Sequence, residues 1–148
     1  SLPFIDLEDE VSGEAAQHVE IGYIGQNPGH VVEYKYNEQL EQYERYEDAE
    51  QTVELNTEEP VRVENVFVVE TAHEVIDQEG RRKIDFASGG NAYLIQKGKY
   101  QQVDWVNDNG QIIPVKDGEK VGFRPGKTWI NVVPTDPGLE ASVNIQAN

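Results

Sequence analysis

The sequence has 148 residues, the length of a single domain, and 37% of them are apolar. No run reaches the ~18 apolar residues of a membrane-spanning helix, and the lack of cysteine excludes disulfides, thiolate metal ligands and thiol catalysis. The net charge of −16 is uneven: residues 1–80 carry 21 acidic and three basic side chains, and residues 81–148 carry seven acidic and nine basic ones. This charge disfavours binding to duplex nucleic acid, which needs clustered Lys and Arg, and is typical of one solvated acidic face.

The first 14 residues are acidic, and we expect a linker or a docked arm there, ahead of one β domain spanning residues 15–148. Two half-buried strands are predicted next, because apolar and polar residues alternate in 19–23 and in 32–36. The Gly- and Pro-containing segment 25–29 predicts the turn that joins them.

Residues 37–51 fit two interpretations. Apolar or aromatic residues recur every third position among good helix formers, but the tyrosines also suit a strand. We predict a strand, because β segments flank this region on both sides. The longest β-like segment is 61–76, in which residues 66–69 are apolar on both faces, as in a central strand. A turn at 78–80 and a short strand at 81–86 are expected to follow.

Residues 89–133 predict a β-meander that carries much of the core and both tryptophans. Its expected strands are 92–96, 100–106, 111–115 and 127–133. Its turns are Lys97-Gly98, Asn109-Gly110 and Asp117-Gly118. Asn-Gly and Asp-Gly are usual in type I′ hairpin turns, because both central positions need a positive φ. Pro125-Gly126 suits a type II turn, and Val143 with Ile145 predicts a last edge strand. Strands spaced this closely by turns indicate a mainly β fold, an antiparallel sandwich or a barrel-like meander, with at most one short helix.

Several stretches between Val19 and Pro134 resemble one known family. They are Tyr34-Lys35-Tyr36-Asn37, Tyr43-Glu44-Arg45, Glu64-Asn65-Val66-Phe67, Gly80-Arg81-Arg82-Lys83-Ile84-Asp85 and, most specifically, Pro125-Gly126-Lys127-Thr128-Trp129-Ile130. This pattern is similar to the C-terminal domain of the YerB-like bacterial lipoproteins, a family of unknown function. The resemblance implies a lipid-anchored protein outside the cytoplasmic membrane of a Gram-positive bacterium, with a preceding α/β domain that this chain lacks. It implies no catalytic residue, and Asn37 and Asn107 depart from the charged residues expected at their positions.

Two motifs imitate known sites. Gly126-Lys127-Thr128 ends like a phosphate-binding loop, but Val121 stands where that loop needs Gly, and a strand is predicted to follow. His73-Glu74-Val75-Ile76-Asp77 is similar to a zinc-protease motif with Asp77 in place of the second His.

His18 and His30 show no partner at ligand spacing and are expected on the surface, and the acidic runs lack the order of a calcium loop. Asp85 and Asp104 could pair as acid and base, as many carboxylates in an acidic chain could. We therefore expect no catalytic residue, no metal site and no cofactor.

The candidate binding residues are Arg124, Lys127, Trp129, Arg81 and Arg82. Arg124 and Lys127 flank the predicted Pro-Gly turn, where Arg suits a carboxylate or phosphate and Lys adds a point charge. The alternative is that this turn only closes a hairpin. Trp129 could stack on a ligand, although a strand tryptophan usually belongs to the core. The basic triplet could instead neutralise nearby carboxylates.

The favoured function is a non-catalytic binding module at the bacterial cell envelope. Its partner would be its own N-terminal domain, another envelope protein or an anionic polymer, and it would touch the membrane only through a lipid anchor beyond these residues. The alternative is a domain of an envelope enzyme whose catalytic groups lie in an N-terminal domain. A pocket holding two or more of Asp85, Asp104, His73 and Arg82 would favour the enzyme, and a flat apolar patch would favour the module.

Overall fold

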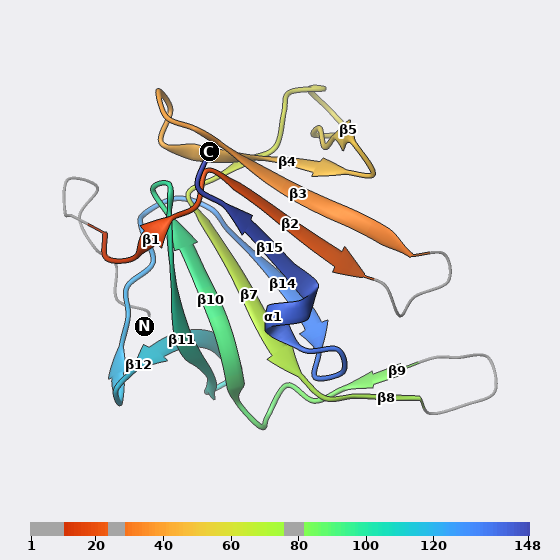
Figure 1. The fold of residues 1–148 in the computed structure, drawn as a ribbon, viewed down its shortest axis with the longest axis vertical. Helices are drawn as coiled ribbons and strands as arrows, with labels where there is room; N and C mark the ends of the chain where they lie inside the picture. The colour runs from red at the N-terminus through yellow and green to blue at the C-terminus, as the bar shows by residue number, and fades with distance from the viewer. Residues whose placement is uncertain (1–10, 24–28, 76–81) are drawn as a thin grey trace.

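The computed structural model of this protein describes residues 11–23, 29–75 and 82–148, and within them the chain is mainly β with a single four-residue helix. Two sheets contain nearly all of these strands, and a two-stranded ribbon projects from one end (Figure 1). The predicted fold class, mainly β with at most one short helix, is therefore confirmed.

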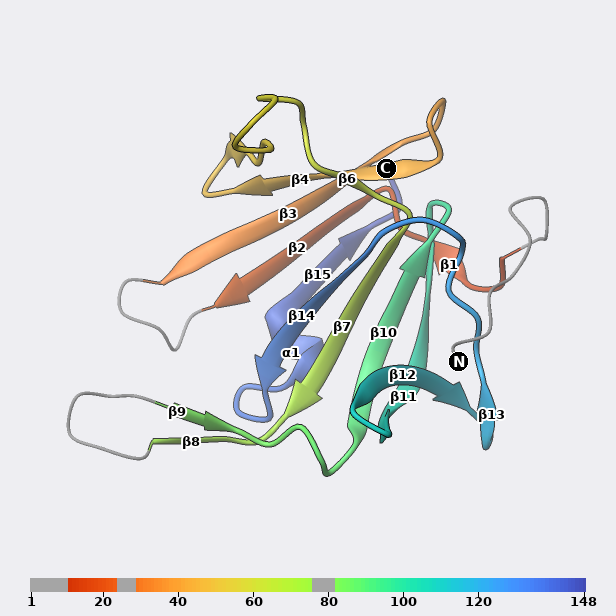
Figure 2. The same cartoon turned by 180° about the vertical axis from the view of Figure 1, so that it is seen from behind.

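The seven-stranded sheet has the order β13-β12-β11-β10-β7-β14, with β1 paired to the start of β11. Its strands are β1 (Glu14–Ala15), β7 (Asn65–Thr71), β10 (Gly90–Gln96), β11 (Lys99–Asp108), β12 (Gln111–Lys116), β13 (Glu119–Lys120) and β14 (Thr128–Pro134). Figure 2 shows β7 between β10 and β14. The predicted central strand at 66–69 is thus confirmed, and each of its residues is fully buried.

The six-stranded sheet has the order β15-β2-β3-β4-β5, with β6 paired to β4. Its strands are β2 (His18–Tyr23), β3 (His30–Asn37), β4 (Gln42–Glu47), β5 (Glu50–Gln51), β6 (Arg62–Val63) and β15 (Val143–Gln146). Helix α1 (Leu139–Ser142) joins β14 to β15, and the projecting ribbon is β8 (His73–Val75) with β9 (Arg82–Ile84). The strand predicted within 37–51 and the last edge strand are both confirmed, whereas the turns predicted at 25–29 and 78–80 fall mainly or wholly outside the described residues.

One part of the predicted meander is wrong. Residues 128–134 do not extend it beside β12, but form β14, which pairs in parallel with β7, so the sheet is not wholly antiparallel. The segment that leads to β14 is held by Asn65, which is fully buried: its Nδ2 donates to the Arg124 carbonyl over 2.9 Å and its Oδ1 accepts from the Arg124 N–H over 2.8 Å. Parallel pairing needs a long crossover, which hairpin signals in the sequence cannot indicate.

The type I′ prediction is confirmed at Asn109-Gly110 and Asp117-Gly118, and the turn predicted at Lys97-Gly98 has the same pair of positive φ values. Lys97, Asn109 and Asp117 have φ of 49°, 52° and 51°, and the glycine that follows each also has a positive φ. Two positive φ values in succession match the right-handed twist of the flanking strands, so these turns fix the register of β10 to β13.

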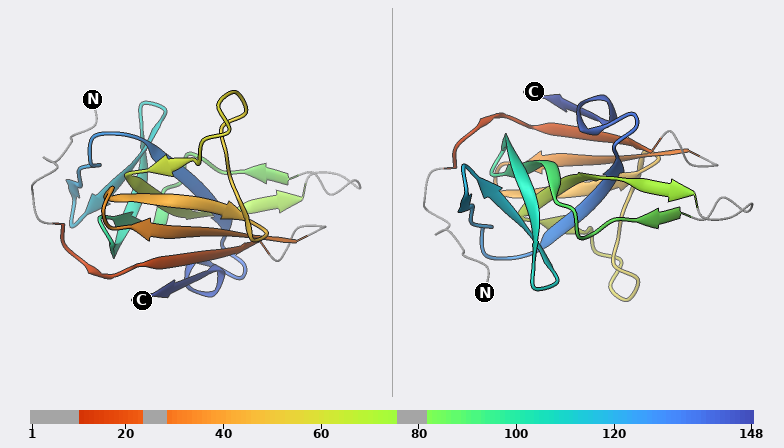
Figure 3. Two further views of the ribbon diagram at one scale, coloured as in Figure 1. Left: turned by 90° about the horizontal axis from the view of Figure 1, so that it is seen from above. Right: turned by 90° about the horizontal axis from the view of Figure 1, so that it is seen from below.

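Two apolar cores lie on opposite faces of the seven-stranded sheet. The first fills the space between the two sheets, which lie one over the other in Figure 3, and includes Val19, Ile21, Val32, Tyr34, Val66, Val68 and Ile95. The second contains Phe67, Val69, Ala92, Leu94, Val103, Trp105 and Phe123. Because successive residues of β7 point to opposite faces, this one strand contributes to both cores. Trp105 of the predicted meander therefore shares this second core with Phe67 and Val69 of β7.

Candidate functional site

The predicted cationic tip is not formed as expected. Arg124 is only 1% exposed, and its Nη2 lies 3.4 Å from Glu41 Oε2. No hairpin closes at Pro125-Gly126, because β13 and β14 are not neighbours in the sheet. The positive charge of Arg124 is therefore enclosed by the fold rather than presented to a partner.

The other predicted binding residues are dispersed. Lys127 is exposed, but its Nζ lies 3.6 Å from Glu54 and its backbone N–H donates to Glu64 over 2.8 Å. Trp129 is half-buried, with the Arg45 guanidinium 4.7 Å from its ring centroid. Arg81 lies outside the described residues, as does the side chain of Arg82. Lys127 is thus the one cation that the structure shows exposed among these predicted residues.

The residues proposed as signs of an enzyme also have structural roles. The Asp85 carboxylate accepts hydrogen bonds from the N–H groups of Ala87 and Ser88, over 2.9 and 3.1 Å, and so closes a tight turn. His73 Nδ1 lies 3.0 Å from the carbonyl of Thr71. Asp85, Asp104 and His73 line none of three concavities that lie on the described part of the chain.

The largest of these concavities, about 650 Å³, is a groove between the two sheets, and we call it the inter-sheet groove. Residues of β10 and β11 line one side of the groove, and residues of β15 and α1 line the other; Figure 1 shows where these elements lie. The first side contributes Tyr93, Tyr100, Gln101 and Gln102. The second side contributes Glu140, Val143 and Ile145, and Gly13, Glu14 and Lys116 complete the lining.

Strand register places the two tyrosines of the groove together. Tyr93 lies opposite Gln102, and Tyr100 lies opposite Ile95, one side-chain repeat further along the same face. The rings meet edge to face, with centroids 5.5 Å apart. Tyr100 also donates its hydroxyl hydrogen to Glu14 Oε2 over 3.0 Å, which ties the groove to β1. The groove therefore has an ordered aromatic wall with amide groups beside it.

A second concavity of about 260 Å³ continues the groove and shares Tyr93, Gln102 and Glu140 with it. Glu70 lines this extension, but its Oε2 accepts the N–H of Leu139 over 2.6 Å and so holds the first turn of α1. Beneath it, Trp105 Nε1 donates to the Glu70 carbonyl over 2.7 Å. The buried tryptophan thereby positions the strand that supports this end of the groove.

The groove environment keeps both tyrosines neutral. Burial raises the pKa of Tyr93, and the nearby Glu140 and Glu70 carboxylates raise it further. The pKa of Tyr100 is raised chiefly by its hydrogen bond to Glu14. Both hydroxyls are therefore hydrogen-bond donors and acceptors at neutral pH, and neither is activated as a base.

The sequence prediction missed the groove, although a signal was present. Tyr93 and Tyr100 sit on predicted meander strands, at positions where a hydrophobic–polar pattern puts them on one face. That face borders the other sheet only because β15 returns to pair with β2, a long-range contact that no local pattern indicates.

A different set of side chains could hold a metal ion. His18, Glu20 and Glu33 lie on β2 and β3, and one potential ligand atom from each lies within 4.8 Å of the others. The sequence shows no partner for His18 at ligand spacing, but the pairing of β2 with β3 brings its Nε2 to 2.6 Å from Glu33.

Comparison with known proteins identifies the family of this chain. Residues 19–130 match the family described as "Protein of unknown function (DUF3048) C-terminal domain". The chain belongs to this family. It is 44% identical over 126 residues to "Putative lipoprotein YerB" of Bacillus subtilis, a match that covers 85% of this chain and 38% of the relative. The crystal structure of the Bacillus subtilis YerB protein has the same fold, with a TM-score of 0.81 and 42% identity over 92% of this chain.

The Bacillus subtilis relative is much longer than this chain, which covers 38% of that protein and 45% of its solved chain. The resemblance carried by the Pro-Gly-Lys-Thr-Trp motif is thus confirmed as a family relationship. Across the described ranges, no helix has the length and apolar character needed to span a membrane.

Proposed function

We propose that this DUF3048 domain is a non-catalytic binding module of an envelope lipoprotein, and that its inter-sheet groove binds an extended, basic peptide segment of a partner protein. The observation that carries this proposal is the position of β15. This strand ends the six-stranded sheet, pairs with β2 on one side, and lines the groove with Val143 and Ile145.

An extended peptide fits such an edge for a general reason. A peptide that adds to a sheet edge gains main-chain hydrogen bonds, and alternate side chains enter pockets on one face. Here those side chains would meet Tyr93, Tyr100 and Gln102 on the opposite side of the groove. Tyrosines supply a large contact area together with a polar group, so they suit a mixed apolar and polar segment.

The charge of the groove selects the kind of peptide. Glu14 and Glu140 line it against the single cation Lys116, whose Nζ lies 3.4 Å from Gln101 Oε1. A basic segment complements these carboxylates, whereas an anionic polymer would be repelled by them. The expected anionic partner therefore fits this groove poorly.

We also propose an extracytoplasmic location at the envelope of a Gram-positive bacterium, with a lipid anchor on another part of the parent protein. The name of the Bacillus subtilis relative, a lipoprotein, supports this location.

A display library of random short peptides, selected against the purified domain, tests the binding function. Selected sequences should alternate apolar and basic residues and lack central prolines, because proline cannot donate a main-chain hydrogen bond.

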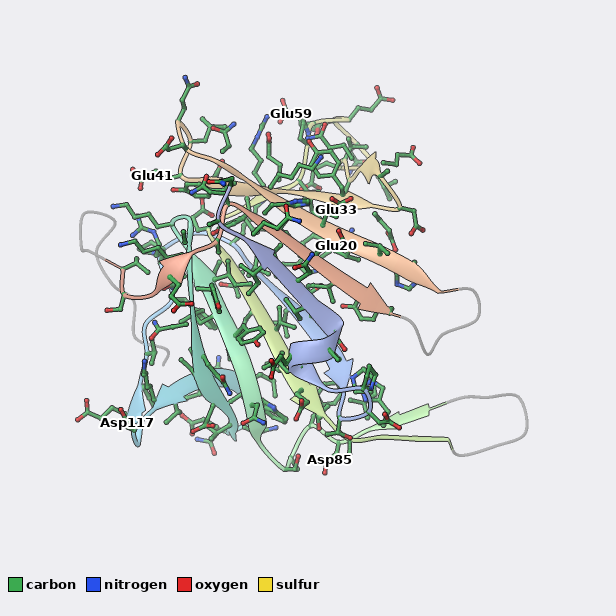
Figure 4. All side chains as sticks on the ribbon, viewed as in Figure 1. Glu20, Glu33, Glu41, Glu59, Asp85 and Asp117 are labelled. Atoms are coloured by element: carbon green, nitrogen blue, oxygen red, sulfur yellow. The ribbon has the colours of Figure 1, made fainter. Side chains whose placement is uncertain are left out.

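Variants distinguish the groove from the rest of the acidic surface. Tyr93→Ala and Glu140→Lys should each lower the affinity of the domain for a selected basic peptide by about tenfold or more. The matched control is Glu59→Lys, which makes the same charge change on an exposed residue at the far end of the molecule (Figure 4). Equal losses in Glu140→Lys and Glu59→Lys would show that only net charge matters, and would reject the groove. If the N-terminal part of a full-length relative displaces a selected peptide from the domain, then the natural occupant of the groove is the N-terminal part of the same protein.

An envelope enzyme is the second candidate, because Glu70 and Glu140 both line the smaller concavity. Turnover of an envelope polymer by the purified chain, abolished by Glu140→Gln, would support this candidate. The commitment of Glu70 to the backbone of α1 argues for the binding module instead.

A further inference from the structure

A second group of polar side chains lies on the outer face of the six-stranded sheet, away from the groove. Val19 and Ile21 of β2 point into the core, so the alternating residues His18 and Glu20 point outward. Glu33 of β3 lies directly opposite Glu20 in the strand register. Figure 4 shows Glu20 and Glu33 on neighbouring strands at this face. Two alternating residues of β2 and one residue of β3 thus lie close together on this outer face.

The electrostatics of this group are unfavourable without a cation. Like charges directly opposite each other on neighbouring strands destabilise a sheet, and Glu20 has no ion-pair partner within the described part of the chain. The nearby Lys35 is turned to the Tyr46 ring, with its Nζ 4.3 Å from the ring centroid. The side chains of His18 and Glu33 are only 23% and 19% exposed, so water screens the carboxylates incompletely.

The contacts of both His18 ring nitrogens also fit the arrangement of a metal ligand. His18 Nδ1 lies 3.2 Å from Gln146 Oε1, a contact that suits the tautomer with its hydrogen on Nδ1. In that tautomer the lone pair of Nε2 points at Glu33 Oε2, which lies 2.6 Å away. Two lone pairs at that distance need either a second ring proton or a metal cation between them. An imidazole whose other nitrogen is held by a side-chain oxygen is the usual arrangement of a metal-binding histidine.

We propose that His18 Nε2, Glu20 and Glu33 bind one divalent transition-metal ion, with water in the remaining coordination positions. One imidazole and two carboxylates form a ligand set suited to Zn²⁺. Zinc bonds of about 2.0–2.2 Å place tetrahedral ligand atoms roughly 3.4 Å apart, so His18 Nε2 and Glu33 Oε2 need to separate by less than about 1 Å. The ion would cancel the repulsion between the carboxylates and tie β2 to β3.

Titration of the purified chain with Zn²⁺ by calorimetry tests the site, with Mg²⁺ as a comparison ion that favours an all-oxygen ligand set. The wild-type chain should bind one Zn²⁺ and unfold roughly 5 °C higher at saturation. His18→Gln should lower the affinity at least tenfold. The matched control is His30→Gln, which alters a second His–Glu pair whose atoms are 3.9 Å apart and whose imidazole stacks on Tyr23.

Two further variants separate metal binding from a merely structural role. Glu20→Gln should stabilise the metal-free chain, because it removes the opposed charge, and should weaken Zn²⁺ binding, so the two effects have opposite signs. Gln146→Ala should lower the affinity for Zn²⁺ roughly 10- to 100-fold, because it removes the hydrogen bond to His18 Nδ1. Nitrogen-15 NMR of His18 should show Zn²⁺ on Nε2 with the Nδ1 hydrogen retained.

Three results would overturn the proposal. They are the absence of Zn²⁺ binding by the wild-type chain, equal affinity in His18→Gln and wild type, and an imidazole that keeps both hydrogens when Zn²⁺ is added. Circular dichroism of each variant checks that the β fold is retained, so that a loss of binding is not a loss of structure.

Discussion

At the scale of single residues, the two tryptophans show how context divides one residue type into two roles. Trp105 is fully buried in the second core and donates from Nε1 to the Glu70 carbonyl. Trp129 is half-buried beneath Arg45 at the margin of the first core. Trp105 therefore supports both the second core and one end of the groove, whereas Trp129 covers the margin of the first core.

This difference gives a prediction for stability. Trp105→Ala should lower the free energy of unfolding by roughly 3–5 kcal/mol, because it leaves a large cavity and an unsatisfied carbonyl. The control Trp129→Ala should cost roughly 1–2 kcal/mol, because its ring is already partly hydrated. Urea denaturation of the two variants measures both values. A loss below about 1 kcal/mol for Trp105→Ala would contradict its position in the core.

At the scale of elements, the hairpin turns differ in what surrounds them. Gly98 and Gly118 occupy the same place in their turns, with φ of 72° and 81°. A Cβ at Gly98 would lie 2.8 Å from Gln17 Nε2 and 3.1 Å from the Tyr36 ring, whereas nothing lies within 4 Å of one at Gly118. The Gly98 turn is therefore packed against the other sheet, and the Gly118 turn is open.

Alanine at each glycine separates backbone strain from packing. Gly118→Ala should cost about 1 kcal/mol, which is the backbone penalty of a positive φ alone. Gly98→Ala should cost about 1 kcal/mol more, because Tyr36 and Gln17 must also move. Thermal unfolding of the two variants compares them directly, and equal midpoints would show that the contacts at Gly98 are easily displaced.

At the scale of the whole molecule, tyrosines rather than carboxylates dominate the buried ionisable groups. Burial raises the pKa of Tyr23, Tyr34 and Tyr43 above the ordinary value of about 10. Tyr43 donates its hydroxyl hydrogen to the Ala16 carbonyl over 2.9 Å, and Tyr34 shares hydrogen bonds with Asn131 between the sheets. The first core is thus built to contain neutral phenols.

The direction of these pKa shifts predicts alkaline unfolding. Because the folded pKa values are raised, the stabilisation is complete below pH ~10, the unfolded pKa, and is lost as pH rises above it. Each such tyrosine should contribute a loss of up to roughly 1.4 kcal/mol per pH unit in that range. Tyr43→Phe should be less stable at neutral pH, through loss of one hydrogen bond, but should show a shallower alkaline decline. Urea midpoints across this range measure both, and a flat profile for the wild-type chain would contradict the prediction.

The sequence by itself determined the elements whose causes are local. Type I′ turns at Asn109-Gly110 and Asp117-Gly118 follow from the positive φ that those residues tolerate. The buried character of β7 follows from apolar residues on both of its faces, and the family follows from a motif of consecutive residues. In each case, the residues that cause the feature lie within a few positions of one another.

Only the tertiary structure decided which segments meet. The parallel pairing of β14 with β7 encloses Arg124, so a charged residue next to a Pro-Gly turn became part of the interior. The pairing of β15 with β2 forms the second wall of the groove, and the pairing of β2 with β3 brings His18 to Glu33. These contacts join residues separated by 15 to 128 positions, and their free energy depends on the packing of whole sheets, which local residue patterns do not encode.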